Sequence, residues 1–112
     1  MTQQKSGSAH GDADGVTLVV TMAIKPEHEQ DFIDYATNVA TKVHEKEAGT
    51  VLYVLTKHPN EPHTYVWVER YRDEKALSAH METAYMADAM SILPTWWAKE
   101  PIALRLAQVM PS

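Results

Sequence analysis

The chain has 112 residues, 45% of them hydrophobic, with a formal net charge of -5 and no cysteine. This length fits one domain, and the missing cysteines exclude disulfides, thiolate nucleophiles, iron–sulfur clusters and cysteine-bound zinc. The acidic charge argues against a nucleic-acid partner, because phosphate binding needs a basic stripe, and no apolar run is long enough to span a bilayer.

The first 15 residues differ from the rest of the chain. They are polar and hold three of the four glycines, which predicts a disordered tail at residues 1–15 followed by one domain at residues 16–112. The tail lacks the hydrophobic segment of a signal peptide, so we expect a cytoplasmic protein. Residues 16–24 then carry apolar side chains on both faces, as in a strand that is covered on two sides.

A helix should follow this strand. Pro26 suits the first helical turn. Four later apolar residues recur at helical spacing: Phe32, Ala36, Val39 and Val43. Gly49 is predicted to end the helix in a left-handed conformation.

A β-hairpin is predicted next. Residues 50–58 and 63–72 are rich in β-branched and aromatic residues, and the segment PNEP at residues 59–62 has turn chemistry. In the second arm, alternate residues share one face of the strand: Tyr65, Trp67, Glu69 and Tyr71. This face therefore combines aromatic rings with one carboxylate.

The remaining sequence predicts a second helix and a last strand. Asp73 can cap a helix whose apolar side includes His80, and helical character should continue, after a break near Thr83, to about Leu93. Residues 102–110 are typical of a strand. The order β-α-β-β-α-β is that of an α+β, ferredoxin-like split βαβ fold, an antiparallel sheet with both helices on one face. Since the other face would be apolar and bare, we expect a second copy to cover it.

Two ionisable residues are candidates for chemistry. An imidazole titrates near neutral pH and can take a proton from a phenol or an enol, so His80 is the strongest candidate base. The alternative is a core histidine that makes one hydrogen bond. Glu69 could orient a histidine or a substrate hydroxyl, although a structural ion pair with Arg70 or Arg105 is the favoured interpretation.

Aromatic residues could supply the walls of a binding site. Four aromatic residues could form a flat pocket for a fused-ring substrate, although such a set is more often core or dimer interface: Tyr53, Tyr65, Trp67 and Tyr71. Trp96 and Trp97 lie between two prolines and could form a pocket lid or a dimer contact. Adjacent residues rarely face the same way, so at most one of the two should serve both as a pocket lid and as a dimer contact. We assign Trp96 to the pocket.

The hairpin turn has some features of a metal site. His58, Glu61 and His63 offer nitrogen and oxygen ligands, but turns of this composition are usually solvated, so no metal is predicted. The sequence also contains no GxGxxG, P-loop, HExxH or GxSxG motif, which leaves nucleotide-binding and serine-hydrolase functions without support.

The sequence resembles the antibiotic biosynthesis monooxygenase family of dimeric α+β barrel proteins, which includes small quinol monooxygenases. The matching landmarks lie between residues 16 and 110: Glu47-Ala48-Gly49, Tyr53, Glu69-Arg70-Tyr71, Asp73, Ala76 and His80. The resemblance implies a homodimer that oxidises a quinol or polyketide-type aromatic substrate with O2 and without a cofactor. His80 would then be the base, Glu69 would orient it, and Trp67 with the tyrosines would form the walls.

One position departs from the family pattern. Many members carry a second histidine five residues after the helix histidine, where this chain has Tyr85. A phenol can donate a hydrogen bond but, with a pKa of about 10, is a poor base at neutral pH, so we place Tyr85 among the substrate-binding residues. Haem-degrading relatives use an Asn, a Trp and a proximal His, for which this chain offers no convincing match, and no haem is predicted.

Two other functions remain open. Some relatives isomerise or otherwise process small phosphorylated carbonyl compounds, a proton-transfer task that His80 could also serve. That function requires a cationic phosphate clamp, for which Arg70, Arg72 and Arg105 are the candidates, although Arg70 projects to the strand face opposite Trp67. The third possibility is a non-catalytic dimer that binds a small molecule, which the missing second histidine favours.

Overall fold

The computed structural model describes residues 14–110, so the tail predicted at residues 1–15 lies outside it except for its last two residues. Within the described range the main elements follow one another along the chain as β1 (Val16–Ala23), α1 (Glu29–Lys46), β2 (Thr50–Lys57), β3 (Thr64–Tyr71), α2 (Glu74–Met81), α3 (Ala84–Ile92) and β4 (Ile102–Ala107). Two short 3-10 turns, Pro26–His28 and Leu93–Thr95, precede α1 and follow α3.

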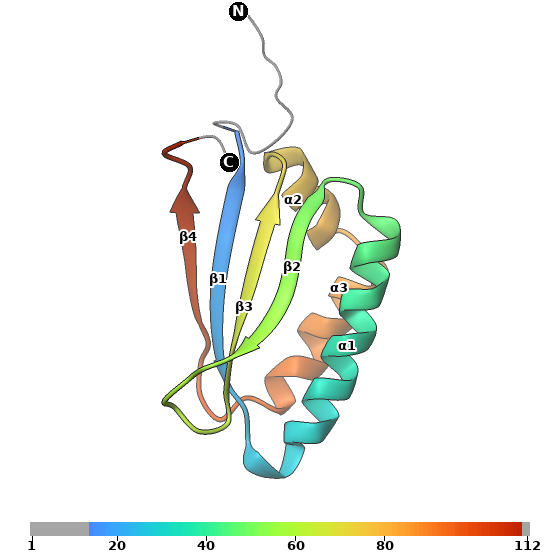
Figure 1. The fold of residues 1–112 in the computed structure, drawn as a ribbon. Helices are drawn as coiled ribbons and strands as arrows, with labels where there is room; N and C mark the ends of the chain where they lie inside the picture. Colours follow the sequence, from blue (N-terminus) through green and yellow to red (C-terminus); the bar gives the residue numbers. More distant parts are fainter. Residues whose placement is uncertain (1–13, 111–112) are drawn as a thin grey trace, which may run out of the picture.

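The strands form one antiparallel sheet in the order β2-β3-β1-β4. In this register Val20 of β1 lies between Trp67 of β3 and Ala103 of β4. The helices lie together on one face of the sheet, and α1 provides the crossover from β1 to β2 (Figure 1). The predicted α+β, ferredoxin-like split βαβ fold is thereby confirmed. The structure describes a single chain, so the dimeric barrel stays a prediction.

The core lies between the helices and the covered face of the sheet. The predicted apolar stripe of α1 is buried as expected: Phe32, Ala36, Val39 and Val43. The ring of Phe32 packs on two aromatic rings of β3, with centroid distances of 5.2 Å to Tyr65 and 6.5 Å to Trp67. Helix α1 is therefore fixed to the strand that carries the aromatic stripe.

Helix α1 ends near the predicted position but for a different reason. The helix stops at Lys46 because Glu47 turns into an extended conformation, with φ -115° and ψ 93°. Gly49 does not adopt the left-handed conformation, so that prediction was wrong. The position instead lacks room, since a Cβ added there would lie 2.6 Å from the Cβ of Ala76 in α2. Gly49 allows the turn before β2 to approach α2 closely.

The two C-terminal helices begin at polar caps. Asp73 accepts a hydrogen bond from the backbone N–H of Ala76 at 2.9 Å, and Thr83 accepts one from Met86 at 3.2 Å. Each cap satisfies an N–H group that has no partner inside its helix. The predicted cap at Asp73 and the break near Thr83 are both confirmed.

The segment between α3 and β4 runs beside the end of β1. Trp97 forms an isolated bridge with Ile24, and the backbone N–H of Ala98 donates to Ala23 O at 2.8 Å. These bonds extend the sheet beyond β1 and fix the two tryptophans. Strand β4 then ends at Ala107, three residues earlier than predicted.

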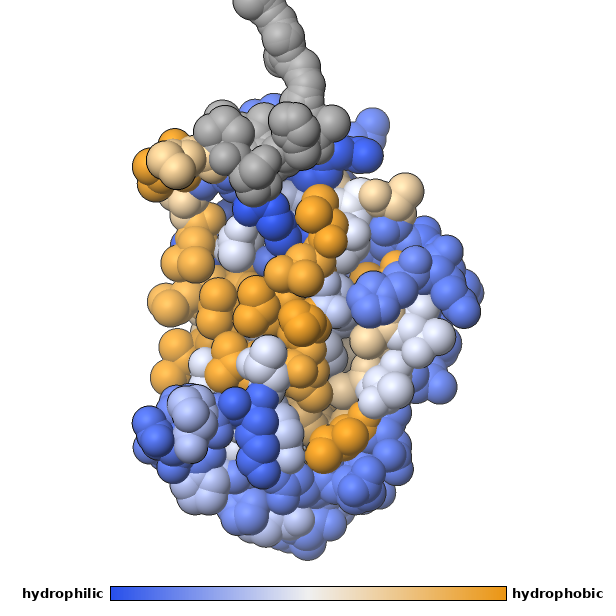
Figure 2. Space-filling model, viewed as in Figure 1, coloured by the Kyte–Doolittle hydropathy of each residue, from blue (hydrophilic) through white to orange (hydrophobic). Residues whose placement is uncertain are grey.

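The face of the sheet away from the helices is apolar and uncovered. One row of the register crosses it from β2 to β4: Val54, Val68, Val19 and Leu104. Figure 2 shows hydrophobic side chains spread over these strands. In β4 the side chains of Ile102, Leu104 and Leu106 remain between 46% and 61% exposed. None of the helices formed by residues 14–110 has the length and apolarity needed to cross a membrane.

Candidate functional site

A cavity of about 280 Å³ lies between the sheet and the helices. Its lining is mainly apolar and aromatic, with Val20, Trp67 and Tyr53 on the sheet side and Met86 on the helix side. Trp67 and Tyr53 pack together with ring centroids 5.1 Å apart, so they form one continuous aromatic wall. Among the described residues that border the cavity, none is Lys or Arg. This lining suits an uncharged or aromatic ligand better than a phosphorylated one.

His80 is the candidate base at this cavity. It lies in the last turn of α2, is 1% exposed, and packs between the rings of Tyr53 and Tyr71 with centroid distances of 5.3 Å to each. Its Nδ1 atom lies 2.9 Å from Oε1 and 3.0 Å from Oε2 of Glu47. A carboxylate only accepts hydrogen bonds, so Nδ1 carries the proton and Nε2 is the basic nitrogen of the neutral ring.

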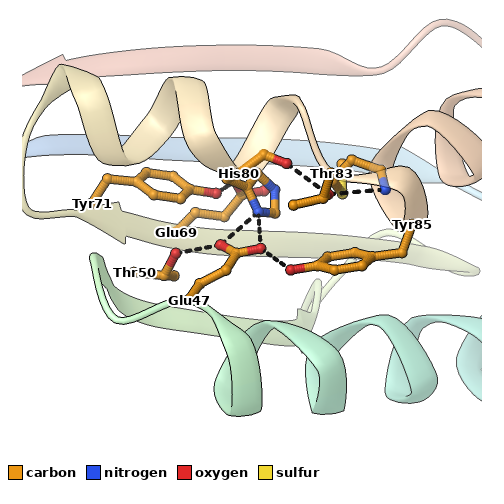
Figure 3. Close-up of polar contacts among 8 residues, drawn as sticks. Glu47, Thr50, Glu69, Tyr71, His80, Thr83 and Tyr85 are labelled. Carbon is orange, nitrogen blue, oxygen red and sulfur yellow. Dashed lines mark hydrogen bonds and ion pairs between the residues drawn. The ribbon is translucent and has the colours of Figure 1, made fainter.

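Glu47 is held by donors from three directions (Figure 3). Besides His80, the Thr50 hydroxyl donates to Oε1 at 2.5 Å and the Tyr85 hydroxyl donates to Oε2. Burial alone would raise the pKa of the Glu47 carboxyl, but the hydrogen bonds from Thr50, Tyr85 and His80 outweigh burial and hold that pKa below its usual range. Glu47 therefore stays ionised beside the histidine.

Glu69 also borders the cavity but has a different environment. It is 8% exposed, and its Oε1 accepts a hydrogen bond of 2.7 Å from the Tyr71 hydroxyl. Burial raises the pKa of the Glu69 carboxyl, since a single tyrosine hydroxyl compensates little of the desolvation. The two carboxyls of this site are thus shifted in opposite directions.

The expected contacts of Glu69 are not found. Glu47, and not Glu69, contacts His80 Nδ1. The alternative ion pairs of Glu69 are also replaced, because Arg105 pairs with Glu74 and Arg70 approaches Thr17 on the uncovered face of the sheet. In the sequence, Glu47 is only a landmark after the first helix. No local pattern connects position 47 with position 80, which is 33 residues away.

The structure separates the predicted wall residues into two groups. Tyr53 and Trp67 border the cavity. The other three tyrosines do not, and each donates its hydroxyl to a carboxylate: Tyr65 to Glu29, Tyr71 to Glu69 and Tyr85 to Glu47. Trp96 also lies outside the cavity lining.

The two tryptophans of the predicted lid have different surroundings. Trp96 packs edge-on against Tyr35, with centroids 5.7 Å apart, and stacks near His28. Trp97, and not Trp96, borders the cavity, and the bridge to Ile24 sets which of the two neighbours faces inward. The indole N–H of Trp97 is buried without a hydrogen-bond partner among residues 14–110.

The histidines of the hairpin turn have structural contacts. His58 Nδ1 accepts hydrogen bonds from the backbone N–H groups of Asn60 and Glu61, at 3.1 and 3.0 Å. His63 adopts a left-handed conformation with φ 57° and contacts Glu29 at 3.0 Å. Within the described part of the chain, no three His, Cys, Asp or Glu side chains are grouped so that they could hold a metal ion.

Comparison with known proteins gives a consistent result. The sequence model of the antibiotic biosynthesis monooxygenase family matches residues 15–91. The protein "Putative monooxygenase YcnE" of Bacillus subtilis (strain 168) is 30% identical over 70 residues, which cover 62% of this chain and 73% of that protein.

Solved structures agree with this match. A "putative antibiotic biosynthesis monooxygenase" from Caulobacter crescentus CB15 superposes with a TM-score of 0.82 at 27% identity, covering 89% of this chain and 92% of that one. Rv0793 from Mycobacterium tuberculosis has the same fold, with a TM-score of 0.78, 18% identity, and coverage of 85% of this chain and 95% of that one. The residues matched by the family model include Tyr53 and Trp67 of the aromatic wall, Glu47 and His80, and the chain belongs to the antibiotic biosynthesis monooxygenase family.

Proposed function

We propose that the protein is a cofactor-independent monooxygenase that oxidises an electron-rich phenol, such as a quinol or a polyketide anthrone, with O2. The observation that carries this proposal is His80, which borders an apolar aromatic cavity while its Nδ1 donates to the ionised Glu47. A base of known tautomer at a cavity whose lining holds no Lys or Arg suits proton removal from a phenol. Family membership supports the reaction class.

The cavity limits the size and polarity of the substrate. Its volume of about 280 Å³ is small for a ligand site, since such sites usually enclose roughly 300–1,000 Å³. The wall of Tyr53 and Trp67 is suited to stacking against a flat ring. We therefore expect a compact quinol to fit better than an extended polyketide.

The proposed reaction begins with proton transfer. The substrate hydroxyl gives its proton to His80 Nε2, and Glu47 stabilises the resulting imidazolium across Nδ1. The electron-rich phenolate passes one electron to O2, and the substrate radical and superoxide combine into a peroxide at a ring carbon. His80 returns its proton to the peroxide. Loss of water from the hydroperoxide, with the hydrogen of that same carbon, leaves a carbonyl, so one oxygen atom enters the product and the other leaves as water.

Glu69 has a supporting role in this proposal. Burial raises its pKa and so shifts the carboxyl toward its protonated form, and in that form it could donate a hydrogen bond to a substrate oxygen inside the cavity. This assignment replaces the expectation that Glu69 orients His80. Glu69→Gln, which keeps a donor, should then retain more activity than Glu69→Leu.

Oxygen consumption with a dihydroquinone, in buffer free of metal and flavin, tests the reaction. We expect turnover above the uncatalysed rate for the wild type and His28→Ala, and none for His80→Ala. His28 is a suitable control because it lies on the surface beside Asp31, away from the cavity lining. Use of 18O2 should place one labelled atom in the product. Equal rates for His80→Ala and the wild type, or no turnover by either, would rule the proposal out.

The other two functions receive less support. A phosphorylated carbonyl substrate needs a cationic clamp at the cavity. Arg105 pairs with Glu74, Arg70 belongs to the uncovered face, and Arg72 borders a separate hollow and not the cavity. A non-catalytic binding protein predicts that quinols raise the melting temperature without consuming O2. The assay above distinguishes that outcome from catalysis.

The working unit is proposed to be a homodimer. The uncovered face of the sheet carries a continuous apolar row that ends at Leu104, which is 54% exposed in the single chain. A second copy packed sheet to sheet would bury this face on both subunits. The interface would lie on the side of the sheet opposite the helices, so it would not cover the cavity between the sheet and the helices.

A further inference from the structure

We propose that Tyr85, at the position where many family members carry a second histidine, is a positioning residue that acts on His80 through Glu47. The geometry that carries this inference is a chain of three side chains from three elements: Tyr85 in the first turn of α3, Glu47 after the end of α1, and His80 in the last turn of α2. Figure 3 shows the Tyr85 ring directed along the chain so that its hydroxyl meets the carboxylate.

Tyr85 reaches Glu47 from the side away from the cavity. Glu47, Thr50 and Tyr85 border a separate hollow of about 440 Å³, together with three cationic side chains: Lys46, Arg72 and Lys75. Tyr85 does not border the cavity that His80 faces. Its hydroxyl therefore has no route to a substrate in that cavity, and any effect on catalysis has to pass through Glu47.

The Tyr85 hydroxyl restricts both the charge and the direction of Glu47. Thr50 holds Oε1 and Tyr85 holds Oε2, so the carboxylate plane is fixed with both oxygens within 3.0 Å of His80 Nδ1. As long as Glu47 is ionised and aimed in this way, the proton of the neutral imidazole stays on Nδ1 and Nε2 stays free to accept one.

A tyrosine suits this task over a wide pH range. Burial, followed by the hydrogen bond to Glu47, raises the pKa of Tyr85 to about 12, so the phenol remains a neutral donor at any physiological pH. A histidine at this position would change its charge near neutrality and with it the field at Glu47. With a tyrosine at position 85, the hydrogen bond to Glu47 therefore does not change with pH near neutrality.

Tyr85→Phe tests the inference, and Tyr65→Phe is its matched control. Tyr65 also donates its hydroxyl to a carboxylate, Glu29 Oε2 at 2.6 Å, but it does not border the cavity. In Tyr85→Phe we expect the Glu47 carboxyl, followed by 13C NMR, to titrate about one pH unit higher, because it loses a donor. Tyr65→Phe should leave the titration of Glu47 unchanged. The inference is overturned when Tyr85→Phe leaves it unchanged as well.

Kinetics provide the second readout, and for its catalytic consequence the inference rests on the proposed function. Tyr85→Phe should lower kcat on the order of tenfold, the effect of weakening a hydrogen bond to a charged group, while KM stays within about twofold. A change in KM with unchanged kcat would contradict a positioning role and indicate contact with substrate. When the wild type turns over no quinol, the proposed function fails, and the NMR titration still decides the role of Tyr85.

Glu47→Gln examines the middle of the chain independently of Tyr85. The amide keeps the shape but can donate to Nδ1, so 15N shifts of the His80 ring should reveal a new population with the proton on Nε2. That tautomer cannot accept a proton from a substrate, and kcat should fall further than in Tyr85→Phe. An unchanged ring tautomer with full activity would contradict the inference even where Tyr85→Phe behaves as expected.

Discussion

Gly49→Ala should destabilise the protein through one steric contact between the turn before β2 and α2. The new Cβ would lie 2.6 Å from the Cβ of Ala76, against 3.4 Å at the short end of ordinary contact, a deficit of 0.8 Å. The Cβ of an alanine has no rotamer that could relieve this overlap. The backbone of Gly49 is outside the left-handed region, so backbone strain adds nothing and the effect is one of packing alone.

The overlap sets the expected magnitude. Extra atoms in a packed interior cost about 1–3 kcal/mol of the free energy of unfolding. For a domain of this size that corresponds to a fall in Tm of about 5–20 °C. The same displacement would move α2, which carries His80, relative to Glu47, which lies two residues before Gly49. We therefore expect kcat to fall together with stability.

Thermal unfolding followed by circular dichroism, on both single variants and the double variant, tests this reasoning. Ala76→Gly alone should cost about 1 kcal/mol, because glycine is a poor helix former. In the double variant the overlap is gone, so its loss should be smaller than the two single losses added together by about 1–2 kcal/mol. The reasoning is refuted when Gly49→Ala stays within about 0.5 kcal/mol of the wild type, or when the two losses simply add.

Three further predictions concern the helix cap, an acid-sensitive contact and the open face. Asp73→Ala removes the bond to Ala76 N–H and should lower the free energy of unfolding in urea by about 0.5–2 kcal/mol, whereas Asp73→Asn should retain most of it. Hydrogen bonds, the first from Tyr65, hold the pKa of Glu29 below 4.5 in the folded chain. As the pH falls below 4.5, Glu29 is protonated in the unfolded chain before it is protonated in the folded one, so the free energy of unfolding should decrease. Glu29→Gln should make this decrease with pH shallower, and a steeper decrease would contradict the assignment. Leu104→Lys should shift sedimentation from dimer to monomer while the circular dichroism spectrum is kept, and an unaltered dimer would place the interface elsewhere.

The order of elements could be predicted because local patterns encode it. The helical spacing of the α1 residues and the alternation in β3 are properties of neighbouring residues, and the structure has both. Gly49 marks the limit of such reasoning. The residue lies next to the end of α1, as a left-handed stop would, but its real constraint comes from Ala76, which only the folded chain brings near. The shorter β4 has a similar origin, since the length of an edge strand depends on its pairing with β1.

The assignment of roles to Glu47 and Glu69 needed the structure for a physical reason. Both carboxyls lie close enough to His80 to interact with its charge. Residue type and strand alternation could place Glu69 on the aromatic face, but they could not count the donors that reach each carboxyl. Glu47 receives three and remains ionised, while Glu69 receives one and is shifted toward its protonated form. One donor of Glu47 is the Tyr85 hydroxyl, so the residue that departs from the family's histidine pair helps to decide which carboxylate supports the base.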